Sequence, residues 1–588
     1  MRLLGISSYY HDAAACLTDQ GRIVAALQEE RFTRRKFDER FPAQAIAECL
    51  RIGRIGPDQI DALVFYDKPW LTFERLLETY LTYAPRGLNS FLRAMPIWLN
   101  GKLNLRGTLK REFRAHFKTV PRILFSEHHL SHAASAFYPS PFEEAAVLCL
   151  DGVGEWATTT AWLGRGDKLV PLWQIRFPHS LGLLYSAFTA FCGFKVNSGE
   201  YKLMGAAPYG KPIYQSLIER ELIDIKEDGS FRLNMKYFDF AAGLRMYNRK
   251  FEALFGFPPR VPETRLREVD FDLAASVQAT TEKAMLRLAR ALRERTGMKN
   301  LCLAGGVALN CVANGKIARE GIFDSIWVQP AAGDAGGALG AALAAHHLHF
   351  REPRQVQKTD GMHGALLGDH FEDTDIESVL RASGVKYRQY ADPRDLLDAC
   401  SELLAQNNVL GWFQNRMEYG PRALGSRSIL ADPRGAKMRA QLNLKIKFRE
   451  TFRPFAPIVM REHVNEYFEF QNESPYMLVV ANVRESRPQD IPAVTHVDGS
   501  ARLQTVDPSR HPRLHALLES FRARTGCPVL INTSFNVRGE PIVHTPAEAL
   551  NGFRNTEMDA LCIGSFLITK ADNPGFANPE WRKSFELD

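Results

Sequence analysis

The sequence lacks closely paired cysteines. Its nine cysteines are scattered along 588 residues, and no two of them stand in a Cys-x-x-Cys spacing. Zinc ribbons and small disulfide-stapled folds both need cysteines at short, regular spacings, so the pattern argues against both classes. Most of the cysteines lie within apolar runs, and we expect them to be reduced thiols of the core.

Long hydrophobic runs are also missing. No apolar stretch is long enough to span a bilayer, and the beginning, MRLLGISSYYHDAAACL, lacks the charged-then-apolar layout of a secretory signal. We therefore expect a cytoplasmic protein without a membrane partner. A strong charge of one sign is missing too, because a net charge of +7 suits an anionic small molecule as well as nucleic acid.

The length indicates more than one domain. A chain of 588 residues is too long for a single hydrophobic core. The texture changes after His349, where a polar, mixed stretch is typical of a linker, and an arginine-dense α/β-like unit follows it. We expect an N-terminal domain over residues 1–355, a linker over 356–394 and a C-terminal domain over 395–588.

The N-terminal part contains a weak internal repeat of pattern. Short apolar runs separated by turns, with a hairpin predicted at Asp19–Gly21, return in AAVLCLDGVGEWATTTAWLGRGDKLVPLWQ. Two later stretches, NLCLAGGVALNCVANGKIARE and SIWVQPAAGDAGGALGAALAAHH, each predict a strand, a Gly-rich turn and a helix. Such turns place backbone N–H groups at helix N-termini, which suits phosphates.

Residues 69–120 are predicted to be a helical insertion. Arg106, Lys110, Arg114 and Lys118 recur every fourth residue and form one basic helix face. We favour a solvated face over a binding surface, and the sequence gives no support for a helix at a membrane surface. We expect the insertion to shape an acceptor pocket or a dimer interface.

The stretch SEHHLSHAASAF holds three histidines. His128 and His132 stand four residues apart, on one face of a predicted helix, while His129 points elsewhere. Asp151 ends a strand in a Gly-rich loop, and Asp334 lies in a second Gly-rich turn. Two His and two Asp fit Fe²⁺, Mn²⁺, Zn²⁺ or Mg²⁺ held beside phosphates. Structural or surface histidines remain the alternative, because spacing alone does not bring the four residues together.

An arginine-rich segment follows at NRMEYGPRALGSRSILADPRGAKMRAQLNLKIKFRETFRPF. Turn residues beside Arg422 and Arg453 fix the backbone, which favours a shaped anion pocket over arginines on ordinary surface turns. Asn532, Ser534 and Asn536 form a polar turn after the strand PVLI. A local turn with its own backbone hydrogen bonds explains that turn equally well.

Eight motifs together resemble one family. EHHLSHAASAF, DGVGEW, GEYKLMGAAPYG, GGVALNCVANGK, GDAGGALGAA, GPRALGSRSILADPR, FRPFAP and NTSFN occur in the order found in the O-carbamoyltransferases of nodulation factors, tobramycin, novobiocin and cephamycin. The resemblance runs from His11 to about Pro541, and residues 69–120 carry no recognisable motif of it. The family's motif is written GEYKLMGLAPYG, and this sequence has Ala206 where the motif has its second Leu. That is a small change at a packing position.

The resemblance implies a fold and a reaction. The fold would be an α/β duplicated actin/Hsp70-like ATPase domain, similar to the threonylcarbamoyl transferases, followed by a YrdC-like twisted α/β domain. Carbamoyl phosphate and ATP would give carbamoyl adenylate, and the carbamoyl group would pass to a hydroxyl of a small natural product or sugar. The cofactors implied are ATP and a divalent metal, Fe²⁺ in this family, with Mn²⁺ and Mg²⁺ as alternatives.

The resemblance also implies roles for residues. His11 would be the general base for the acceptor hydroxyl. His128, His132, Asp151 and Asp334 would hold the metal. The nucleotide or adenylate would contact Asp12, Lys36, Asp151, Glu200, Gly306 and Asn310. Carbamoyl phosphate and the triphosphate would be held by Arg422, Lys447, Arg453 and Arg502, and Asn532 would lie near the nucleotide.

Two other functions compete with this one. A tRNA-modifying threonylcarbamoyl transferase has both domain types, but it predicts a stronger basic surface, and GPRALG and FRPFAP speak against it. A non-catalytic nucleotide-binding protein would have been favoured by loss of His11 or of the metal ligands, and all are present. We expect a small hydroxyl acceptor as the partner, no nucleic acid, and a homodimer.

Overall fold

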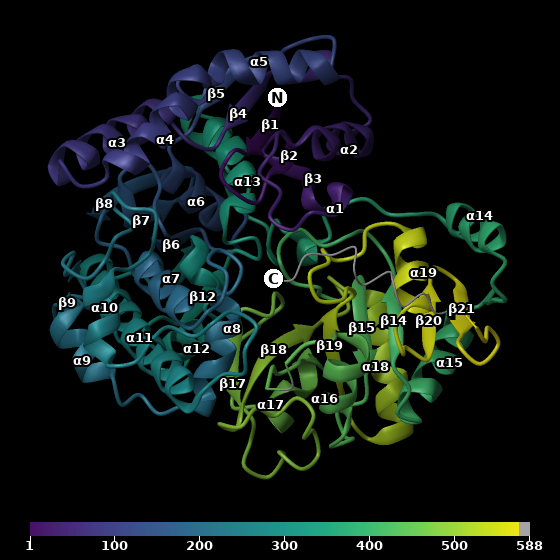
Figure 1. Ribbon diagram of the computed structural model, residues 1–588. Helices are drawn as coiled ribbons and strands as arrows, with labels where there is room; N and C mark the ends of the chain where they lie inside the picture. The colour runs from purple at the N-terminus through teal and green to yellow at the C-terminus, as the bar shows by residue number, and fades with distance from the viewer. Residues whose placement is uncertain (451, 576–588) are drawn as a thin grey trace. The chain divides into compact units, whose positions relative to one another are not determined.

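The computed structural model describes residues 1–450 and 452–575 (Figure 1). The chain forms two compact units, of which the first comprises Met1–Glu29 and Glu39–Gly361, and the second comprises Glu30–Asp38 and the residues from Met362 on. Both units contain helices and sheets, so the mixed α/β class expected from the sequence is confirmed.

Two five-stranded sheets of the same topology build the first unit. Each begins with a three-stranded antiparallel meander, and two further strands extend it in parallel beside the meander's first strand. The strand orders are β3-β2-β1-β4-β5 and β8-β7-β6-β11-β12, so the second sheet repeats the first. The repeat predicted from the strand pattern is therefore confirmed.

The strands of the first sheet are β1 (Arg2–Ser7), β2 (Ala14–Asp19), β3 (Arg22–Gln28), β4 (Ala62–Phe65) and β5 (Arg122–Phe125). Those of the second are β6 (Glu144–Leu150), β7 (Ala157–Arg165), β8 (Lys168–Arg176), β11 (Asn300–Ala304) and β12 (Ser325–Val328). A small hairpin joins β9 (Ile223–Ile225) to β10 (Phe231–Leu233). The main helices are α2 (Ala43–Gly53), α6 (His128–Phe137), α7 (Leu181–Phe191), α8 (Glu200–Ala206), α9 (Gln215–Glu221), α10 (Arg249–Phe255), α11 (Glu268–Thr296), α12 (Cys311–Arg319) and α13 (Asp334–Ala344).

Helices α13 and α6 pack unusually closely, because their touching faces consist of small residues. A Cβ atom on Gly340 of α13 would overlap the carbonyl oxygen of Ser131 in α6. A Cβ atom on Gly5 of β1 would likewise overlap the carbonyl oxygen of Ala338. Helix α13 is buried along its whole length. These close approaches fix the N-terminus of α13 relative to α6 and thereby position Asp334.

Residues 69–120 contain the helices predicted for them: α3 (Pro69–Tyr83), α4 (Leu88–Ile97), a π-helical turn (Trp98–Lys102) and α5 (Leu105–His116). Ring contacts of 5.9 Å between Phe73 and Trp98, and of 5.2 Å between Tyr80 and Phe91, join α3 to the following helix. Lys102 Nζ donates a hydrogen bond of 3.0 Å to the carbonyl of Tyr9, so the insertion is attached to the β1–β2 loop.

The second unit is built on a nine-stranded mixed sheet of order β13-β21-β20-β14-β15-β19-β16-β18-β17. Its strands are β13 (Arg388–Gln389), β14 (Leu410–Phe413), β15 (Arg427–Ala431), β16 (Ala456–Met460), β17 (Val479–Asn482), β18 (Ser500–Val506), β19 (Val529–Ser534), β20 (Ala560–Ile563) and β21 (Phe566–Thr569). Its helices are α1 (Glu30–Thr33), α14 (Asp373–Ser383), α15 (Pro393–Ala405), α16 (Met438–Gln441), α17 (Val464–Tyr467), α18 (Pro512–Thr525) and α19 (Pro546–Arg554).

The structure departs from the expected domain boundaries in two places. Residues 356–394 were expected to be a linker, but from Met362 on they belong to the second unit and contain α14 and β13, which pairs with β21. Helix α14 buries only Ile376 and Leu380, and its polar remainder has the composition of a linker. The segment Glu30–Asp38 also belongs to the second unit, where Arg34 pairs with Glu540 at 2.8 Å.

Candidate metal centre and anion site

The candidate metal centre begins at the N-terminus of α6. The Glu155 carboxylate accepts the backbone N–H of His128 at 2.9 and 3.1 Å, which satisfies a donor that the helix itself leaves unpaired. The helix continues through an alanine-rich run, a composition that favours helix. His128 and His132 therefore stand one turn apart, and their Nε2 atoms lie 3.1 Å from each other.

Two aspartates from separate loops complete the cluster. Asp151 follows β6, where its Oδ1 accepts the N–H of Gly306 at 3.0 Å. Asp334 is the first residue of α13, and its Oδ2 accepts a hydrogen bond of 3.0 Å from the Tyr66 hydroxyl. Each carboxylate is held through one oxygen, so the other oxygen faces the histidines.

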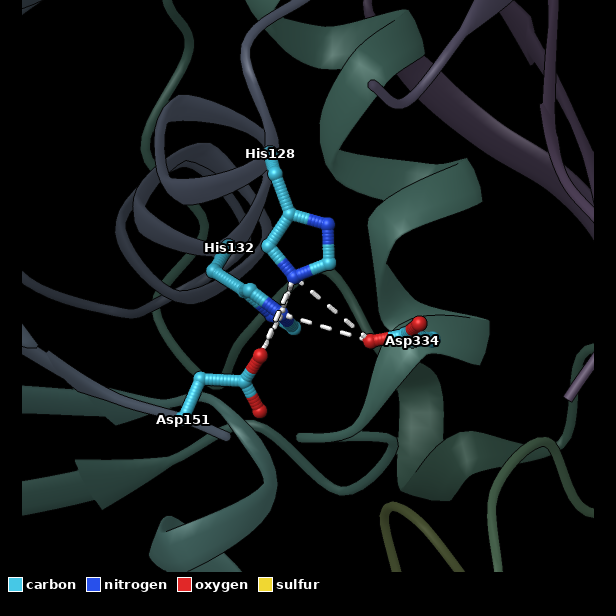
Figure 2. Close-up of side chains that lie close together, drawn as sticks. All are labelled: His128, His132, Asp151 and Asp334. Carbon is cyan, nitrogen blue, oxygen red and sulfur yellow. Dashed lines mark hydrogen bonds and ion pairs between the residues drawn. The ribbon is translucent and has the colours of Figure 1, made fainter. Parts of the chain in front are cut away.

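The four side chains converge on one point, as Figure 2 shows. His128 Nε2 lies 3.1 Å from Asp151 Oδ2 and 3.6 Å from Asp334 Oδ1. His132 Nε2 lies 4.0 Å from Asp151 Oδ2 and 3.7 Å from Asp334 Oδ1. All four ligand atoms lie within 4.8 Å of one another. The sequence expectation that these four residues meet is confirmed.

The cluster fits a divalent cation. Ligand atoms about 2.1 Å from one metal ion lie roughly 3.0 to 3.4 Å from each other, close to the spacings seen here. Two imidazole nitrogens and two carboxylates are a donor set that suits Fe²⁺, Mn²⁺ and Zn²⁺. His132 and Asp334 are almost completely buried, so the two carboxylates need a compensating positive charge.

The pKa values of the cluster also indicate that the two carboxylates need a positive charge beside them. Burial disfavours an imidazolium, yet Asp334 and Asp151 outweigh it and raise the pKa of His128 to about 10. Burial likewise opposes ionisation of Asp334, but His11 and His128 lower the pKa of Asp334 to about 2. The carboxylates thus hold positive charge on the His128 imidazole, a charge that a bound cation would supply instead.

His11 lies at the open side of this cluster. Its Nε2 is 3.6 Å from Asp334 Oδ2, and its Nδ1 is 3.6 Å from Asp12 Oδ2. Partial burial opposes its protonation, but Asp334 and Asp12 raise the pKa of His11 to about 10. The side chain keeps 36% of its surface exposed, so it can meet a molecule from outside. The structure therefore brings His11 and Asp12 together with the four predicted ligands.

Glu155, beside the cluster, has no role predicted from the sequence. Glu155 accepts the N–H groups of His128 and of Lys68, the latter at 3.0 Å, and so ties α6 to the end of β4. Burial and the adjacent Asp67 carboxylate raise the pKa of Glu155 to about 8. The only signal in the sequence was the position of Glu155 within DGVGEW. His129, by contrast, faces away and contacts Thr160 Oγ1 at 2.9 Å, as predicted.

Of the residues predicted to contact the nucleotide in the first unit, Gly306 contacts the metal cluster directly, whereas Asn310 and Glu200 stand at the starts of α12 and α8. Gly306 donates to Asp151, as described above. Asn310 caps α12 and exchanges two amide hydrogen bonds of 3.0 Å with Gln278. Glu200 begins α8 and accepts the Ser186 hydroxyl at 2.7 Å. Lys36 differs from these, because it lies in the segment that belongs to the second unit.

A buried lysine forms the centre of the anion site in the second unit. Lys447 Nζ donates to the carbonyls of Ser534 at 2.7 Å and Asn536 at 2.8 Å, and to the Asn536 side chain at 2.7 Å. Burial and the charges of Arg449, Arg453 and Lys36 lower the pKa of Lys447 well below its ordinary value. The predicted residues Lys36, Lys447 and Arg453 therefore share one strongly basic environment.

The remaining predicted residues of this unit lie around Asn532. Its side-chain nitrogen donates to the carbonyl of Ala423 at 3.1 Å and to Gln504 at 2.9 Å. Arg422 directly precedes Ala423, and Arg502 stands two residues before Gln504 on β18, hence on the same face of the strand. Gln504 had no role in the sequence analysis, since a lone glutamine in a strand carries no signal.

Arg427 is the other unexpected feature of this unit. It is completely buried, donates to the carbonyls of Gln414 at 2.7 Å and Asn415 at 3.1 Å, and stacks 3.7 Å above the Phe413 ring. Burial, opposed by nearby carboxylates of which Glu418 is the first, lowers the pKa of Arg427 to about 10. Its contacts are those of a structural group that joins β14 to the GPRALG turn.

Comparisons with known proteins cover almost the whole chain. Residues 2–343 match the family model for the carbamoyltransferase N-terminus, and residues 401–570 match that for the carbamoyltransferase C-terminus. An uncharacterised protein of Synechocystis is 55% identical over 100% of both chains. Nodulation protein NolNO of Sinorhizobium fredii is 39% identical over 96% of this chain and 80% of its own. The 3'-hydroxymethylcephem-O-carbamoyltransferase of Amycolatopsis lactamdurans is 37% identical over 46% of this chain and 49% of its own.

Solved structures are similar only remotely. Component A of the (R)-2-hydroxyglutaryl-CoA dehydratase of Acidaminococcus fermentans gives a TM-score of 0.32 at 16% identity, over 59% of this chain and 98% of its own. Full-length HypF in its phosphate- and nucleotide-bound form gives 0.30 at 13% identity, over 59% of this chain and 55% of its own. Within residues 1–450 and 452–575, no helix is both long and apolar enough to cross a bilayer.

Proposed function

Because the chain belongs to the carbamoyltransferase family, we propose that it makes carbamoyl adenylate from carbamoyl phosphate and ATP and transfers the carbamoyl group to a hydroxyl of a small molecule. That membership makes the protein an enzyme of the carbamoyltransferase type. Carbamate alone is a poor acyl donor, and adenylation gives it a good leaving group. Two half-reactions therefore need two sites, and each unit carries one candidate.

The first half-reaction belongs to the second unit. With water, carbamoyl phosphate yields carbamate and inorganic phosphate, and a carbamate oxygen then attacks the α-phosphorus of ATP, which expels pyrophosphate. Arg422, Lys447, Arg453 and Arg502 supply the positive charge that two polyanionic substrates require, and Asn532 lies among them. The depressed pKa of Lys447 supports this role, because burial and then the charges of Arg449, Arg453 and Lys36 disfavour its protonated form, and a bound anion would offset those charges.

The second half-reaction belongs to the first unit. The acceptor oxygen attacks the carbonyl carbon of the carbamoyl adenylate, the bond to the AMP oxygen breaks, and the hydroxyl proton passes to His11. His11 can accept that proton only as a neutral imidazole, and a cation bound to Asp334 would favour this form by offsetting the carboxylate that raises the pKa of His11. A divalent ion held by His128, His132, Asp151 and Asp334 would neutralise phosphate charge and stabilise the departing AMP. Gly306 contacts Asp151, and Asn310 caps the N-terminus of α12, where backbone N–H groups suit a phosphate.

The finer fold assignment is part of this proposal. The repeated five-stranded sheet supports an actin/Hsp70-like ATPase fold for the first unit, similar to the threonylcarbamoyl transferases. The mixed nine-stranded sheet of the second unit is compatible with a YrdC-like domain. Fe²⁺ is the metal we propose, and the donor set also accepts Mn²⁺.

The observation that carries the proposal is the convergence of two histidines and two aspartates beside His11 in a chain of this family. The experiment is to incubate the full chain with ATP, carbamoyl phosphate and Mn²⁺ or Fe²⁺, without acceptor, and to measure pyrophosphate. Release that needs carbamoyl phosphate is expected, and Arg453→Ala should abolish it.

Arg487→Ala is the matched control, since this arginine lies in the same unit but pairs with Asp490 at the surface. It should release pyrophosphate as the wild type does. Pyrophosphate release that is independent of carbamoyl phosphate, or equal in wild type and Arg453→Ala, would contradict the proposed half-reaction.

A further inference from the structure

Helix α4 carries two apolar faces, although a surface helix needs only one. Its inner face packs through Phe91 against Tyr80, while the Ser90 hydroxyl is bonded to the carbonyl of Ala242. Its outer face shows Leu88 and Leu92, and Leu99 continues the same line in the π-helical turn; their exposed fractions are 60%, 60% and 62%. Spacings of four and seven residues keep them on one side of the helix, where Met95, which has the same spacing from Leu88, is buried and marks the inner edge of that side. We call these three residues the leucine face.

The same segment carries a high positive charge. Residues 69–120 contain nine Lys and Arg against three Glu, a net charge of +6, whereas the whole chain carries +7. Most of the basic side chains are exposed in the structure: Arg86, Arg93, Arg106, Lys110, Arg111, Arg114 and Lys118. The remaining residues are thus nearly neutral overall, although the arginine-rich segment of the second unit is also strongly basic, and within the first unit the helical insertion is a strongly basic segment.

We propose that the leucine face and the basic residues of α4 and α5 form a docking surface for an anionic phospholipid membrane. Leucines flanked by lysine and arginine are the composition of helices that lie in the membrane interface. The leucines would enter the boundary between headgroups and acyl chains, and the basic side chains would meet the lipid phosphates. A helix lying on a membrane needs no spanning segment, so the missing hydrophobic runs do not bear on it.

The charge and the apolar side chains of this surface argue against two other binding partners, a second copy of this chain and a nucleic acid. A second copy of this chain would bring two segments of net charge +6 together, which opposes self-association through this surface. A nucleic acid would meet the basic residues but leaves no role for three exposed leucines, because its backbone is polar and charged. An anionic bilayer satisfies the charge and the apolar face together.

The position of the surface gives docking a consequence for the enzyme. Lys102, at the end of the π-helical turn, donates to the carbonyl of Tyr9 and lies 4.2 Å above the Tyr10 ring. Those tyrosines directly precede His11. A membrane bound at the leucine face is therefore linked, through one side chain, to the loop that carries His11.

The test is co-sedimentation of the full chain with vesicles of phosphatidylcholine, with and without phosphatidylglycerol. We expect binding only to the anionic vesicles, and weaker binding as salt rises. A charge variant (Lys110→Gln, Arg114→Gln, Lys118→Gln) should bind about a hundredfold more weakly, at about fivefold for each charge. A leucine variant (Leu88→Gln, Leu92→Gln, Leu99→Gln) should lose roughly tenfold for each leucine.

Two matched variants control for surface composition. One replaces exposed basic residues elsewhere (Lys299→Gln, Arg394→Gln, Lys437→Gln), and one replaces exposed apolar residues elsewhere (Ile213→Gln, Leu244→Gln, Val261→Gln). Both should bind vesicles as the wild type does. All variants should keep the wild-type melting temperature, because every substituted side chain is exposed.

Three results would overturn the proposal. One is a wild-type chain that ignores anionic vesicles at low salt. Another is a leucine variant that binds anionic vesicles as tightly as the wild type does. The same holds if the wild type binds a DNA oligonucleotide and the leucine variant binds that oligonucleotide equally tightly. The third is a wild-type dimer that the leucine variant converts to monomers without any vesicle binding, since the face would then join two copies.

Discussion

Removal of the Glu155 carboxylate should loosen the metal centre without touching a metal ligand. This carboxylate accepts the N–H of His128 and that of Lys68 at 2.9 and 3.0 Å, and thereby holds the first turn of α6 in place. His132, one turn further along, is completely buried and should stay in position. Glu155→Gln therefore disturbs one ligand of four and leaves the other three.

The magnitude follows from those hydrogen bonds. Glutamine has one acceptor oxygen instead of two, so it places an N–H group where Glu155 Oε2 accepts the His128 N–H, and leaving a buried donor unsatisfied costs about 1 to 3 kcal/mol. Changes in the partners of metal ligands typically reduce metal affinity about 10- to 100-fold. A tenfold change corresponds to about 1.4 kcal/mol, so loss of one such bond accounts for the whole range. We expect Glu155→Gln to bind Mn²⁺ about 10- to 100-fold more weakly than the wild type.

The assay is calorimetric titration of the metal-free chain with Mn²⁺. Glu127→Gln is the matched control, because Glu127 stands at the same helix end but is half-exposed and pairs with Lys68 Nζ at 2.8 Å. It should bind Mn²⁺ as the wild type does. Equal affinities for wild type and Glu155→Gln, or equal losses in both variants, would refute the positioning role of Glu155.

Three further predictions concern other parts of the chain. Arg427→Met leaves buried carbonyls without their donor and should destabilise the second unit by about 3 kcal/mol in urea denaturation. Burial opposes ionisation of Asp369, but the hydrogen bond and charge of His544 outweigh burial and lower the pKa of Asp369. The ionised carboxylate therefore stabilises the folded state at pH values above its unfolded pKa of about 3.9, and this stabilisation is lost on acidification. The stability lead of the wild type over Asp369→Asn should accordingly shrink as the pH falls below about 4, and an unchanged gap would contradict this. Lys102→Met, which frees the loop before His11, should slow transfer to a hydroxyl acceptor while pyrophosphate release stays at the wild-type rate.

The metal centre was predictable because its signals are local. The four-residue spacing of His128 and His132 places both on one helix face, and Asp151 and Asp334 stand where strands give way to Gly-rich loops. In a duplicated sheet such loops lie at one edge, so residues that follow the strands in the sequence lie close together in the fold. The repeat of strands was predictable for the same reason.

The rest depends on packing between distant segments. Glu155 acts through the N–H groups of His128 and Lys68, and no spacing in the sequence announces that contact. The linker was misjudged because α14 is polar on most of its surface and buries only two side chains. The segment that contains Lys36 is flanked on both sides by residues of the first unit, although the segment itself belongs to the second unit. Its position in the sequence therefore does not indicate its place in the fold. The leucine face is likewise invisible in the sequence, because the sequence does not say which apolar residues of α4 are covered.

The most direct test of two half-reactions on two units is mass spectrometry of the species formed from ATP and carbamoyl phosphate, with Lys447→Met and Asp334→Asn compared. We expect Lys447→Met to form no carbamoyl adenylate, whereas Asp334→Asn should form it and fail to pass the carbamoyl group to a hydroxyl. Loss of the adenylate in Asp334→Asn, or its formation at the wild-type level in Lys447→Met, would contradict the division of labour proposed here.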